Sequence, residues 1–404
     1  MRVAIEEEAM LAGKHGPPVA KAMEILVALG EIYGAERFVP VVSVQVAGVS
    51  YGNLGQAGLD FLREWANAGA RVVVPTTLNP AGMDLQAWRE LGIPEAYARS
   101  QLEIIDAYRA MGVTPNCSCT PYLAGNLPEL GQHLAWSESS AVSYANSVLG
   151  ARTNREGGPS ALAAALTGRT PAYGLHLDHN RRAGLVVDVN CQLTSTADYS
   201  ALGYTVGPTA KDGVPYFRFH HGPQPGLDEL KALGAAMAAS GAVALYHVEG
   251  VTPEARYSDM MADSATTVIT IESIGEGYRT LGGSGQAIDL VWLGCPHASL
   301  AEIEHTADQL RERRVTPRLW ITAAREVLEQ ASARGLTARI EACGGRVVAD
   351  ACLIGAPLDE MGITSVATNS AKAALYLRSQ QGVQVRFGTL AQCIDAAIQG
   401  KWLA

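Results

Sequence analysis

The feature that most constrains this chain is the alternation of short β-rich segments with amphipathic helical segments along most of its length. Residues 19–33 place Val19, Met23, Leu26 and Leu29 at the spacing of one helix face. Similar patterns predict helices over 54–68, 95–111, 139–149 and 161–166, and strands over 38–49, 71–75, 242–248, 267–271, 288–293, 318–322 and 346–349. Strands followed by helices of about ten or more residues are typical of βαβ units. The sequence therefore predicts an α/β fold with mostly parallel sheets.

The length and composition indicate a large folded chain with more than one subdomain. It has 404 residues, of which 48% are hydrophobic and 18% are charged. At roughly 100–200 residues per domain, we expect two or three α/β subdomains. Proline, glycine and histidine cluster within residues 210–225, which predicts a boundary there. The composition excludes a mainly disordered chain, because such chains are poor in apolar residues.

The charge and the apolar runs exclude two classes of partner. The formal net charge is −9, and the sequence lacks the basic stripe that is typical of nucleic-acid binders. No apolar run approaches the ~20 residues that a membrane-spanning helix needs. Glu6, Glu7 and Glu8 lie where a secretory signal would have basic residues. We therefore expect a cytoplasmic protein that binds neither nucleic acid nor membranes.

The seven cysteines pose the central question of this sequence. They are scattered, and a disulfide framework is not expected in a reducing compartment. Cys295 and Cys352 follow predicted strands, and Cys119 lies in a polar loop. Because ligands gather beyond the carboxyl ends of parallel strands, these three thiols could converge on one metal centre. They could equally be buried core residues, which is the role we assign to Cys191, Cys343 and Cys393.

Several polar loops offer the rest of a site. Gly48, Val49 and Ser50 follow a predicted strand, where backbone N–H groups can approach an anion. Asn79 and Pro80 lie in the loop after another predicted strand. Two further segments precede helices, namely 137–140 with Glu138 and Ser139, and 368–372 with Lys372. Each of these is explained either by N-capping of the helix or by an anion-binding site.

The segment 152–160, RTNREGGPS, is too rich in glycine and proline to form a regular element throughout. Its two arginines, Arg152 and Arg155, have a counterpart in the pair Arg181 and Arg182. These guanidinium groups either clamp a carboxylate through two hydrogen bonds or pair with acidic side chains at the surface.

Taken together, five stretches resemble the aconitase X family, and more closely its large, catalytic subunit. They are CTPY at 119–122, AWSESSA at 135–141, YANSVLGARTNREGGPS at 144–160, GCPH at 294–297 and TNSAK at 368–372. The resemblance covers residues 1–404, and the long block at 144–160 is its most specific part. It implies an aconitase-like α/β/α architecture with mostly parallel sheets and an iron–sulfur-dependent hydro-lyase.

The resemblance also implies roles for individual positions. The cluster ligands would be Cys119, Cys295 and Cys352, which are compatible with a [2Fe–2S], a [3Fe–4S] or a [4Fe–4S] cluster. The residues lining the substrate site would be Gly48, Val49, Ser50, Asn79, Pro80, Glu138, Ser139 and Lys372, of which Glu138, Ser139 and Lys372 would be catalytic. Two positions depart from the family pattern. Ala371 lies where glycine is expected, and Cys117 adds a second thiol beside Cys119.

Known family members dehydrate either cis-3-hydroxy-L-proline or mevalonate 5-phosphate. We expect the first substrate, which would yield Δ1-pyrroline-2-carboxylate, because the sequence shows no cluster of Lys and Arg dedicated to a phosphate; mevalonate 5-phosphate is the alternative. A hypothesis of another class is a non-catalytic scaffold that lacks the cluster. The family also has a swivelling domain that supplies a catalytic serine. Since residues 1–404 are taken up by the large-subunit region, we expect that domain on a separate small subunit.

Overall fold

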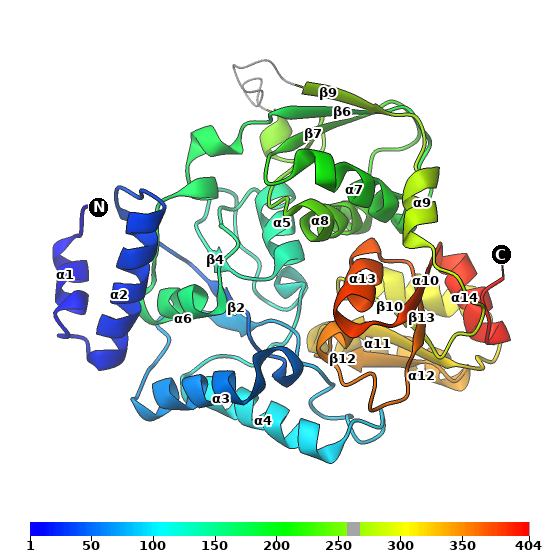
Figure 1. Ribbon diagram of the computed structural model, residues 1–404, viewed down its shortest axis with the longest axis horizontal. Coiled ribbons are helices and arrows are strands. Elements are labelled where there is room, and N and C mark those ends of the chain that lie inside the picture. The colour runs from blue at the N-terminus through cyan, green and yellow to red at the C-terminus, as the bar shows by residue number, and fades with distance from the viewer. Residues whose placement is uncertain (257–266, 404) are drawn as a thin grey trace.

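The computed structural model describes residues 1–256 and 267–403. Its described residues form three parallel sheets and one antiparallel strand pair. Figure 1 shows the N-terminal part with α2 (Pro17–Ile32), α3 (Tyr51–Asn67) and α4 (Glu95–Ala110) on one side and the C-terminal sheet on the other. The part with α7 (Thr196–Ala210) and α8 (Leu227–Gly241) lies above them. This arrangement confirms the α/β prediction, because α-helices lie between most consecutive strands of the parallel sheets in the described residues.

The first sheet belongs to the N-terminal part of the chain and has the strand order β3-β2-β4. Its parallel strands are β2 (Val44–Val46), β3 (Thr76–Leu78) and β4 (Ala135–Trp136). The surrounding helices are α1 (Ile5–Leu11), α2 (Pro17–Ile32), α3 (Tyr51–Asn67), α4 (Glu95–Ala110), α5 (Ser139–Ser147) and α6 (Gly158–Thr167). β1 (Phe38–Pro40) and β5 (Arg169–Pro171) form the antiparallel pair.

The second sheet is four-stranded, with the order β8-β7-β6-β9, and all its pairs are parallel. Its elements are β6 (Leu185–Val189), α7 (Thr196–Ala210), β7 (Pro215–Phe219), α8 (Leu227–Gly241), β8 (His247–Val248) and β9 (Thr267–Ile271). α7 packs on α8, and α8 also contacts α5 and the C-terminal part. The predicted boundary segment 210–225 contains β7, which pairs on both sides within this sheet.

The third sheet is five-stranded and parallel, with the order β12-β11-β10-β13-β14. Its elements are α9 (Gly275–Leu281), β10 (Leu290–Leu293), α10 (Leu300–Leu310), β11 (Arg318–Ala323), α11 (Arg325–Ala333), α12 (Leu336–Ala342), β12 (Arg346–Ala349), β13 (Ser365–Thr368), α13 (Ala371–Tyr376), β14 (Gln384–Phe387) and α14 (Leu390–Gln399). Side chains alternate between the two faces of β10. Leu290 and Trp292 pack on the face covered by α13, and Val291 and Leu293 pack on the face covered by α10, α11, α12 and α14.

Short turns of helix connect these elements. The 3₁₀ turns are η1 (Pro121–Leu123), η2 (Gly174–His176), η3 (Asp178–Arg181), η4 (Glu254–Arg256) and η5 (Leu353–Gly355), and a π-helical turn, η6 (Leu377–Gln381), follows α13. Helix starts agree with local sequence signals. For example, Ser195 and Asp198 form a capping box at the start of α7.

Two strand predictions are wrong in position. Residues 71–75 were predicted as a strand, but the strand is β3, which begins at Thr76. The N–H of Val73 bonds to the carbonyl of Ala165 outside any sheet, and the Val73 side chain is 63% exposed. Of residues 242–248, only His247 and Val248 pair as a strand. In both segments the tertiary context overrides strand propensity.

The described residues contain no helix that is both long and apolar enough to cross a bilayer.

Candidate active site

A cavity of about 230 Å³ lies where the carboxyl ends of the first and third sheets face each other. Its lining includes the three cysteines Cys119, Cys295 and Cys352. Cys295 follows β10 and Cys352 follows β12, while Cys119 follows a segment that pairs with Leu78 at the end of β3. Segments far apart in the sequence therefore place three thiols in one cavity, as expected for the carboxyl edges of parallel sheets.

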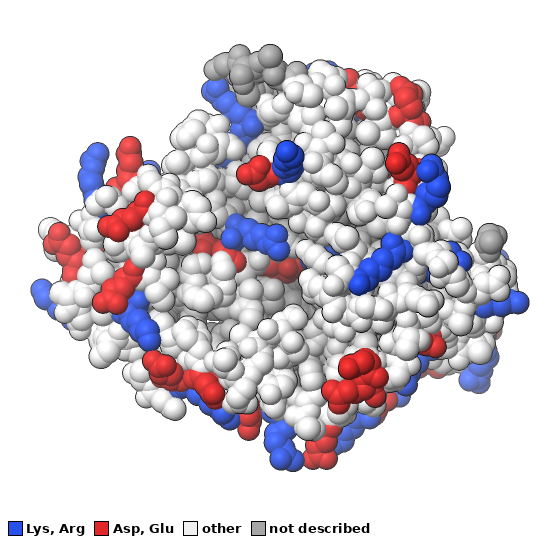
Figure 2. Space-filling view, viewed as in Figure 1, with Lys and Arg blue, Asp and Glu red and all other residues white. Residues whose placement is uncertain are grey.

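Figure 2 shows the face of the molecule that is drawn in Figure 1. Acidic and basic side chains are interspersed over this face, and both signs are present around a hollow near its middle. No single-sign field covers the face, in keeping with the small net charge for a chain of this length. The charges that matter for chemistry are therefore the few that line the cavity.

Lys372 and Glu138 form a buried ion pair at the cavity. Glu138 is the N-cap of α5, and its Oε1 accepts hydrogen bonds from the Ser140 N–H and hydroxyl. Lys372 lies on the first turn of α13 and also donates to Ser140 Oγ at 3.2 Å. Burial by itself raises the pKa of Glu138, but Lys372 and the Ser140 hydrogen bond outweigh it, so the pKa is lowered. Glu138 is therefore a carboxylate paired with an ammonium ion.

Cys119 is buried and Cys295 and Cys352 are partly buried. Burial raises the pKa of each thiol, in the case of Cys295 to about 12. Lys372 opposes this effect at all three sites. Within residues 1–256 and 267–403, no three His, Cys, Asp or Glu side chains are grouped closely enough to hold a single metal ion. A multi-iron cluster has a different requirement, because each thiolate binds a separate iron and the sulfur atoms lie farther apart.

The other predicted site residues divide into two groups. Ser50, Asn79, Pro80, Glu138, Ser139 and Lys372 line the cavity, and Oδ1 of Asn79 is buried there without a hydrogen-bond partner in the protein. Gly48 and Val49 do not line it. Their carbonyls accept hydrogen bonds from Tyr108 and Gln101 behind the loop, so these two residues support the loop that presents Ser50.

Gln101 on α4 is a residue that the sequence did not single out. Its side chain is fully buried. Nε2 donates to the Val49 carbonyl at 2.7 Å, and Oε1 accepts from the N–H groups of Tyr51 and Gly82 at 3.1 and 3.0 Å. One amide thereby joins the loop of Ser50 to the loop of Asn79. The sequence feature that could have indicated this role is a glutamine on the otherwise apolar face of the helix predicted over 95–111.

The loop of Cys352 is fixed against the loop of Asn79. The Cys352 N–H donates to the carbonyl of Ala81 at 2.8 Å, and the Ala81 N–H donates to the carbonyl of Asp350. The Arg325 guanidinium bonds both Asp84 and Asp350. These contacts connect the first and third sheets directly beside the cavity.

Three of the arginines singled out in the sequence lie in different surroundings. Arg155 is exposed and lines the cavity. Arg181 is buried and paired with Glu254 inside the protein, and Arg152 pairs with Asp178 at the surface. Arg155 is thus the guanidinium of the 152–160 segment that is available to a ligand in the cavity.

The remaining cysteines do not contribute to the cavity lining. Cys117 is buried in the core of the first part, Cys343 and Cys393 are buried beneath the third sheet, and Cys191 packs against the core of the second part. Ala371, which replaces the expected glycine, is the first residue of α13 and has no positive φ. The backbone there needs no glycine, so alanine leaves the Lys372 turn intact.

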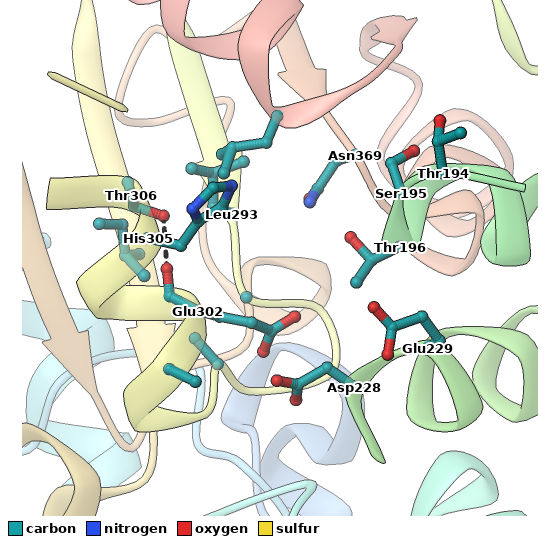
Figure 3. Close-up of a pocket in the computed structure, with 15 residues that line it drawn as sticks. Thr194, Ser195, Thr196, Asp228, Glu229, Leu293, Glu302, His305, Thr306 and Asn369 are labelled. Atoms are coloured by element: carbon teal, nitrogen blue, oxygen red, sulfur yellow. Dashed lines mark hydrogen bonds between the residues drawn. The ribbon is translucent and has the colours of Figure 1, made fainter. Parts of the chain in front are cut away.

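A second cavity of about 300 Å³ lies on the other side of the Cys295 loop. Figure 3 shows the carboxylates of Asp228, Glu229 and Glu302 around it, with Asn369 and His305 at the opposite wall. Among the residues that the structure describes, no cysteine and no lysine line it. Its acidic lining does not suit an anionic substrate. The reactive residues that the sequence singled out line the cavity with the thiols instead.

Comparisons with known proteins agree with this geometry. The first, second and third domains of aconitase X match residues 1–179, 183–277 and 288–399. The chain belongs to the aconitase X family. The crystal structure of Thermococcus kodakaraensis aconitase X in its holo-form is similar, with a TM-score of 0.91 and 47% identity, and the match covers 98% of this chain and 100% of that one.

This chain is similar to aconitase X relatives that are named for two different dehydratase activities. A phosphomevalonate dehydratase large subunit from Methanothermobacter thermautotrophicus is 54% identical over 379 residues, which are 93% of this chain and 94% of that protein. A cis-3-hydroxy-L-proline dehydratase from Pseudomonas aeruginosa is 39% identical over 408 residues, which are 98% of this chain and 70% of that protein. Both names are those of dehydratases, and this aconitase X chain is a hydro-lyase.

Proposed function

We propose that this chain is the large subunit of an iron–sulfur dehydratase that removes water from mevalonate 5-phosphate. The observation that carries the proposal is the presence of Cys119, Cys295 and Cys352 in one cavity with the Lys372–Glu138 ion pair. Three thiols and a lysine–carboxylate pair are the groups that a dehydratase needs to hold a cluster and to bind a β-hydroxy acid.

The residues at the cavity fit an iron–sulfur cluster. The donor set is made of thiols alone, which favours iron–sulfur clusters over the hard cations that prefer oxygen. Three protein thiolates leave one iron of a four-iron cluster without a protein ligand. When bound, such a cluster supplies a Lewis acid that polarises the departing hydroxyl of the substrate.

The residues of the chain then bind and orient the acid. Loss of the proton α to the carboxylate builds negative charge on that carboxylate. Lys372 donates to Glu138 and Ser140, and its third N–H remains for the substrate carboxylate. The N–H of Ser139, at the first position of α5, is one of the donors that a helix leaves unpaired. Glu138, ionised at neutral pH because its pKa is lowered, orients the β-hydroxyl. We assign the base for the α-proton and a catalytic serine to the partner subunit.

The choice of substrate rests on the relatives and on Arg155. The phosphomevalonate dehydratase large subunits from Methanothermobacter thermautotrophicus and Methanocaldococcus jannaschii are 54% and 47% identical to this chain, and the matches cover 94% and 98% of their lengths. Arg155 lines the cavity from its exposed side and supplies a bidentate donor for a phosphate. The elimination across C2 and C3 gives an α,β-unsaturated acid that retains the 5-phosphate.

The partner is a small subunit with a swivelling domain. Relatives that match over nearly their full length carry the name large subunit, whereas the chain spans 70% of the Pseudomonas aeruginosa dehydratase. The name large subunit supports a separate small subunit as the partner. The cavity is open on one side, where Arg155 lies, and we propose that the small subunit closes it.

A second candidate substrate is cis-3-hydroxy-L-proline, which is the substrate that we expected from the sequence. It is also a β-hydroxy acid, and the relative from Pseudomonas aeruginosa named for its dehydration is 39% identical to this chain. Elimination would give an enamine that tautomerises to a cyclic imine. The two candidates differ in the group at the far end of the cavity, since the amino acid has no phosphate for Arg155 to bind.

The deciding experiment is an anaerobic assay of the chain copurified with its small subunit, on both acids. We expect dehydration of mevalonate 5-phosphate, little activity on cis-3-hydroxy-L-proline, and little activity from the large chain alone. Turnover of cis-3-hydroxy-L-proline without turnover of mevalonate 5-phosphate overturns the substrate assignment. Full turnover by the chain alone overturns the division of the site between two subunits.

A further inference from the structure

His297 lies where the segments of all three cysteines meet. It is 1% exposed and follows Cys295 by two residues. Its Nε2 bonds the carbonyl of Ala351, next to Cys352, at 2.8 Å. Its Nδ1 bonds the hydroxyl of Ser118, next to Cys119, at 3.0 Å. One imidazole ring therefore connects the three thiol-bearing loops.

The partners define the tautomer of the ring. A carbonyl oxygen is an acceptor, so Nε2 of His297 carries the hydrogen and donates it to Ala351. Nδ1 is then the acceptor. The Ser118 hydroxyl oxygen accepts a hydrogen bond from the N–H of Thr120 at 3.0 Å, and its own hydrogen is donated to Nδ1. Both ring nitrogens are satisfied by groups on the other two loops.

The backbone of His297 makes two further contacts. Its N–H donates to Sγ of Cys119 at 3.0 Å, and a donor of this kind favours the thiolate over the thiol. Its carbonyl accepts from Nζ of Lys231 on α8 at 3.3 Å. Lys231 is itself buried between Asp228 and Glu302. The second part of the chain is thus joined to the same point as the first and third.

His297 is not among the residues that line the cavity. Its contacts are with neighbours of the cysteines and not with the space in which a substrate would lie. We propose that His297 is a positioning residue that holds the Cys119, Cys295 and Cys352 loops together before the iron–sulfur cluster binds. This inference rests on the proposed function for the identity of the metal group, but not for the connection between the loops.

The physical reason is that three separate loops must be ordered to form one ligand set. If the metal-free loops moved independently, cluster binding would have to compensate for their lost conformational freedom. A residue fixed to all three loops removes part of that cost. Groups that orient metal ligands from behind typically change metal affinity by about 10–100-fold when mutated.

The test uses variants that break one link at a time. In His297→Gln the amide keeps a donor near the position of Nε2 and loses the acceptor for Ser118. Ser118→Ala removes the same link from the other side, together with the two contacts of the Ser118 hydroxyl to Thr120. The control is His247→Gln, since His247 is also a fully buried histidine whose Nε2 bonds a backbone carbonyl, that of Arg181, at 2.8 Å, and it lies in the second sheet.

The first measurement is hydrogen exchange on the metal-free chain. We expect the amides of residues 117–120 to exchange faster in His297→Gln and Ser118→Ala than in the wild type, and at wild-type rates in His247→Gln. Both variants break the link between Ser118 and His297 and keep the donor to the Ala351 carbonyl, so the amides of residues 350–353 should exchange at wild-type rates. Unchanged exchange of residues 117–120 in His297→Gln overturns the proposal. This measurement needs no cluster, so its outcome is independent of the proposed function.

The second measurement is a chelator titration of the anaerobically reconstituted chain, followed by iron and sulfide content and by the visible charge-transfer bands. We expect about tenfold weaker iron retention in each variant and altered bands at equal iron content. The double variant should retain iron no less well than Ser118→Ala alone, because both single variants remove the same link between Ser118 and His297. Wild-type retention and bands in His297→Gln overturn the positioning role. A wild-type chain that takes up neither iron nor sulfide overturns the proposed function. In that case the loops that His297 connects do not bind an iron–sulfur cluster.

Discussion

Lys372 and Glu138 are separated by 234 positions in the sequence and form a buried ion pair across one cavity. Each comes from the start of a helix, Lys372 from α13 and Glu138 from α5. The pair joins the first and third parts of the chain at the point where the thiols gather. Its side chains are only 10% and 12% exposed, respectively, so neither charge is well solvated if its partner is removed.

Loss of one member of this pair should destabilise the protein. For Lys372→Met we expect a loss of about 3–5 kcal/mol, because Glu138 is left as an unpaired buried charge. The double variant Lys372→Met, Glu138→Gln should lose less than the sum of the single losses. Chemical denaturation of the isolated chain measures both. Lys21→Met breaks the exposed pair with Glu64 and should change stability by less than about 1 kcal/mol. Additive losses in the double variant would contradict the coupling.

The ligand assignment is tested by two neighbouring cysteines. Cys117 and Cys119 are both buried, at 1% and 8% exposure, but Cys119 lines the cavity and Cys117 packs in the core. We expect Cys119→Ser to lose most of the bound iron and the brown colour after anaerobic reconstitution, and Cys117→Ser to keep both. Loss of colour in Cys117→Ser and not in Cys119→Ser would make Cys117 the cluster ligand and Cys119 the core residue. A well-folded wild-type chain that stays colourless and metal-free would instead favour a non-catalytic scaffold.

The Gln101 amide should prove structurally important beyond its own helix. Gln101→Met keeps the shape of the side chain and leaves the Val49 carbonyl and the N–H groups of Tyr51 and Gly82 without their partner. A buried unsatisfied polar group costs about 1–3 kcal/mol, so we expect a loss of stability of that order or greater and a raised KM. The matched control is Gln56→Met, at an exposed position of α3. Equal stability of the two variants would refute the role of Gln101.

Arg155 is predicted to bind the anionic end of the substrate. Hydrogen bonds to charged groups contribute about 1.5–3 kcal/mol, so Arg155→Gln should raise KM for mevalonate 5-phosphate by about 10–100-fold with a smaller effect on kcat. Arg155→Lys should restore only part of the affinity, because lysine cannot bind bidentately. Steady-state kinetics of the copurified complex measure this, with Arg99→Gln on α4 as the control. An unchanged KM in Arg155→Gln would remove Arg155 from the site.

The histidine pair His133 and His176 should make the fold sensitive to acid. Their Nδ1 atoms lie 2.9 Å apart, and burial, with the His133 charge and nearby arginines, lowers the pKa of His176 to about 3. The folded state therefore binds this proton less readily than the unfolded chain, whose histidine pKa is about 6.5. The contribution of His176 is complete above about pH 6.5 and is lost as the pH falls toward about 3, at up to ~1.4 kcal/mol per pH unit.

Urea unfolding at a series of pH values from neutral to mildly acidic measures this dependence. In His176→Gln the slope of stability with pH should be smaller by that amount, since the titrating group is gone. His305→Gln, at an exposed position of α10, should keep the wild-type slope. Identical slopes in wild type and His176→Gln would show that the pair does not govern acid stability.

Much of the architecture follows from local sequence. The helix periodicity at 19–33 and 95–111 predicts α2 and α4 to within a few residues. The strand patterns ahead of Cys295 and Cys352 predict β10 and β12, and with them the edge at which those thiols lie. These predictions succeed because amphipathic spacing is a property of neighbouring residues. Parallel strands joined by helices also allow few topologies. Residues 71–75 fail because the N–H groups of Val72 and Val73 bond to the carbonyls of Met111 and Ala165, outside any sheet.

What the sequence determined by itself is the α/β class, the family resemblance and the set of reactive residues that could meet. What only the tertiary structure decided is which of them do meet. Cys117 and Cys119 are alike in sequence, and only the path of the chain turns one toward the cavity. Gln101 and His297 bond loops that lie far from them in sequence. Such contacts have no local signature, because a hydrogen bond between distant segments depends on the packing of whole sheets and not on the residues beside it.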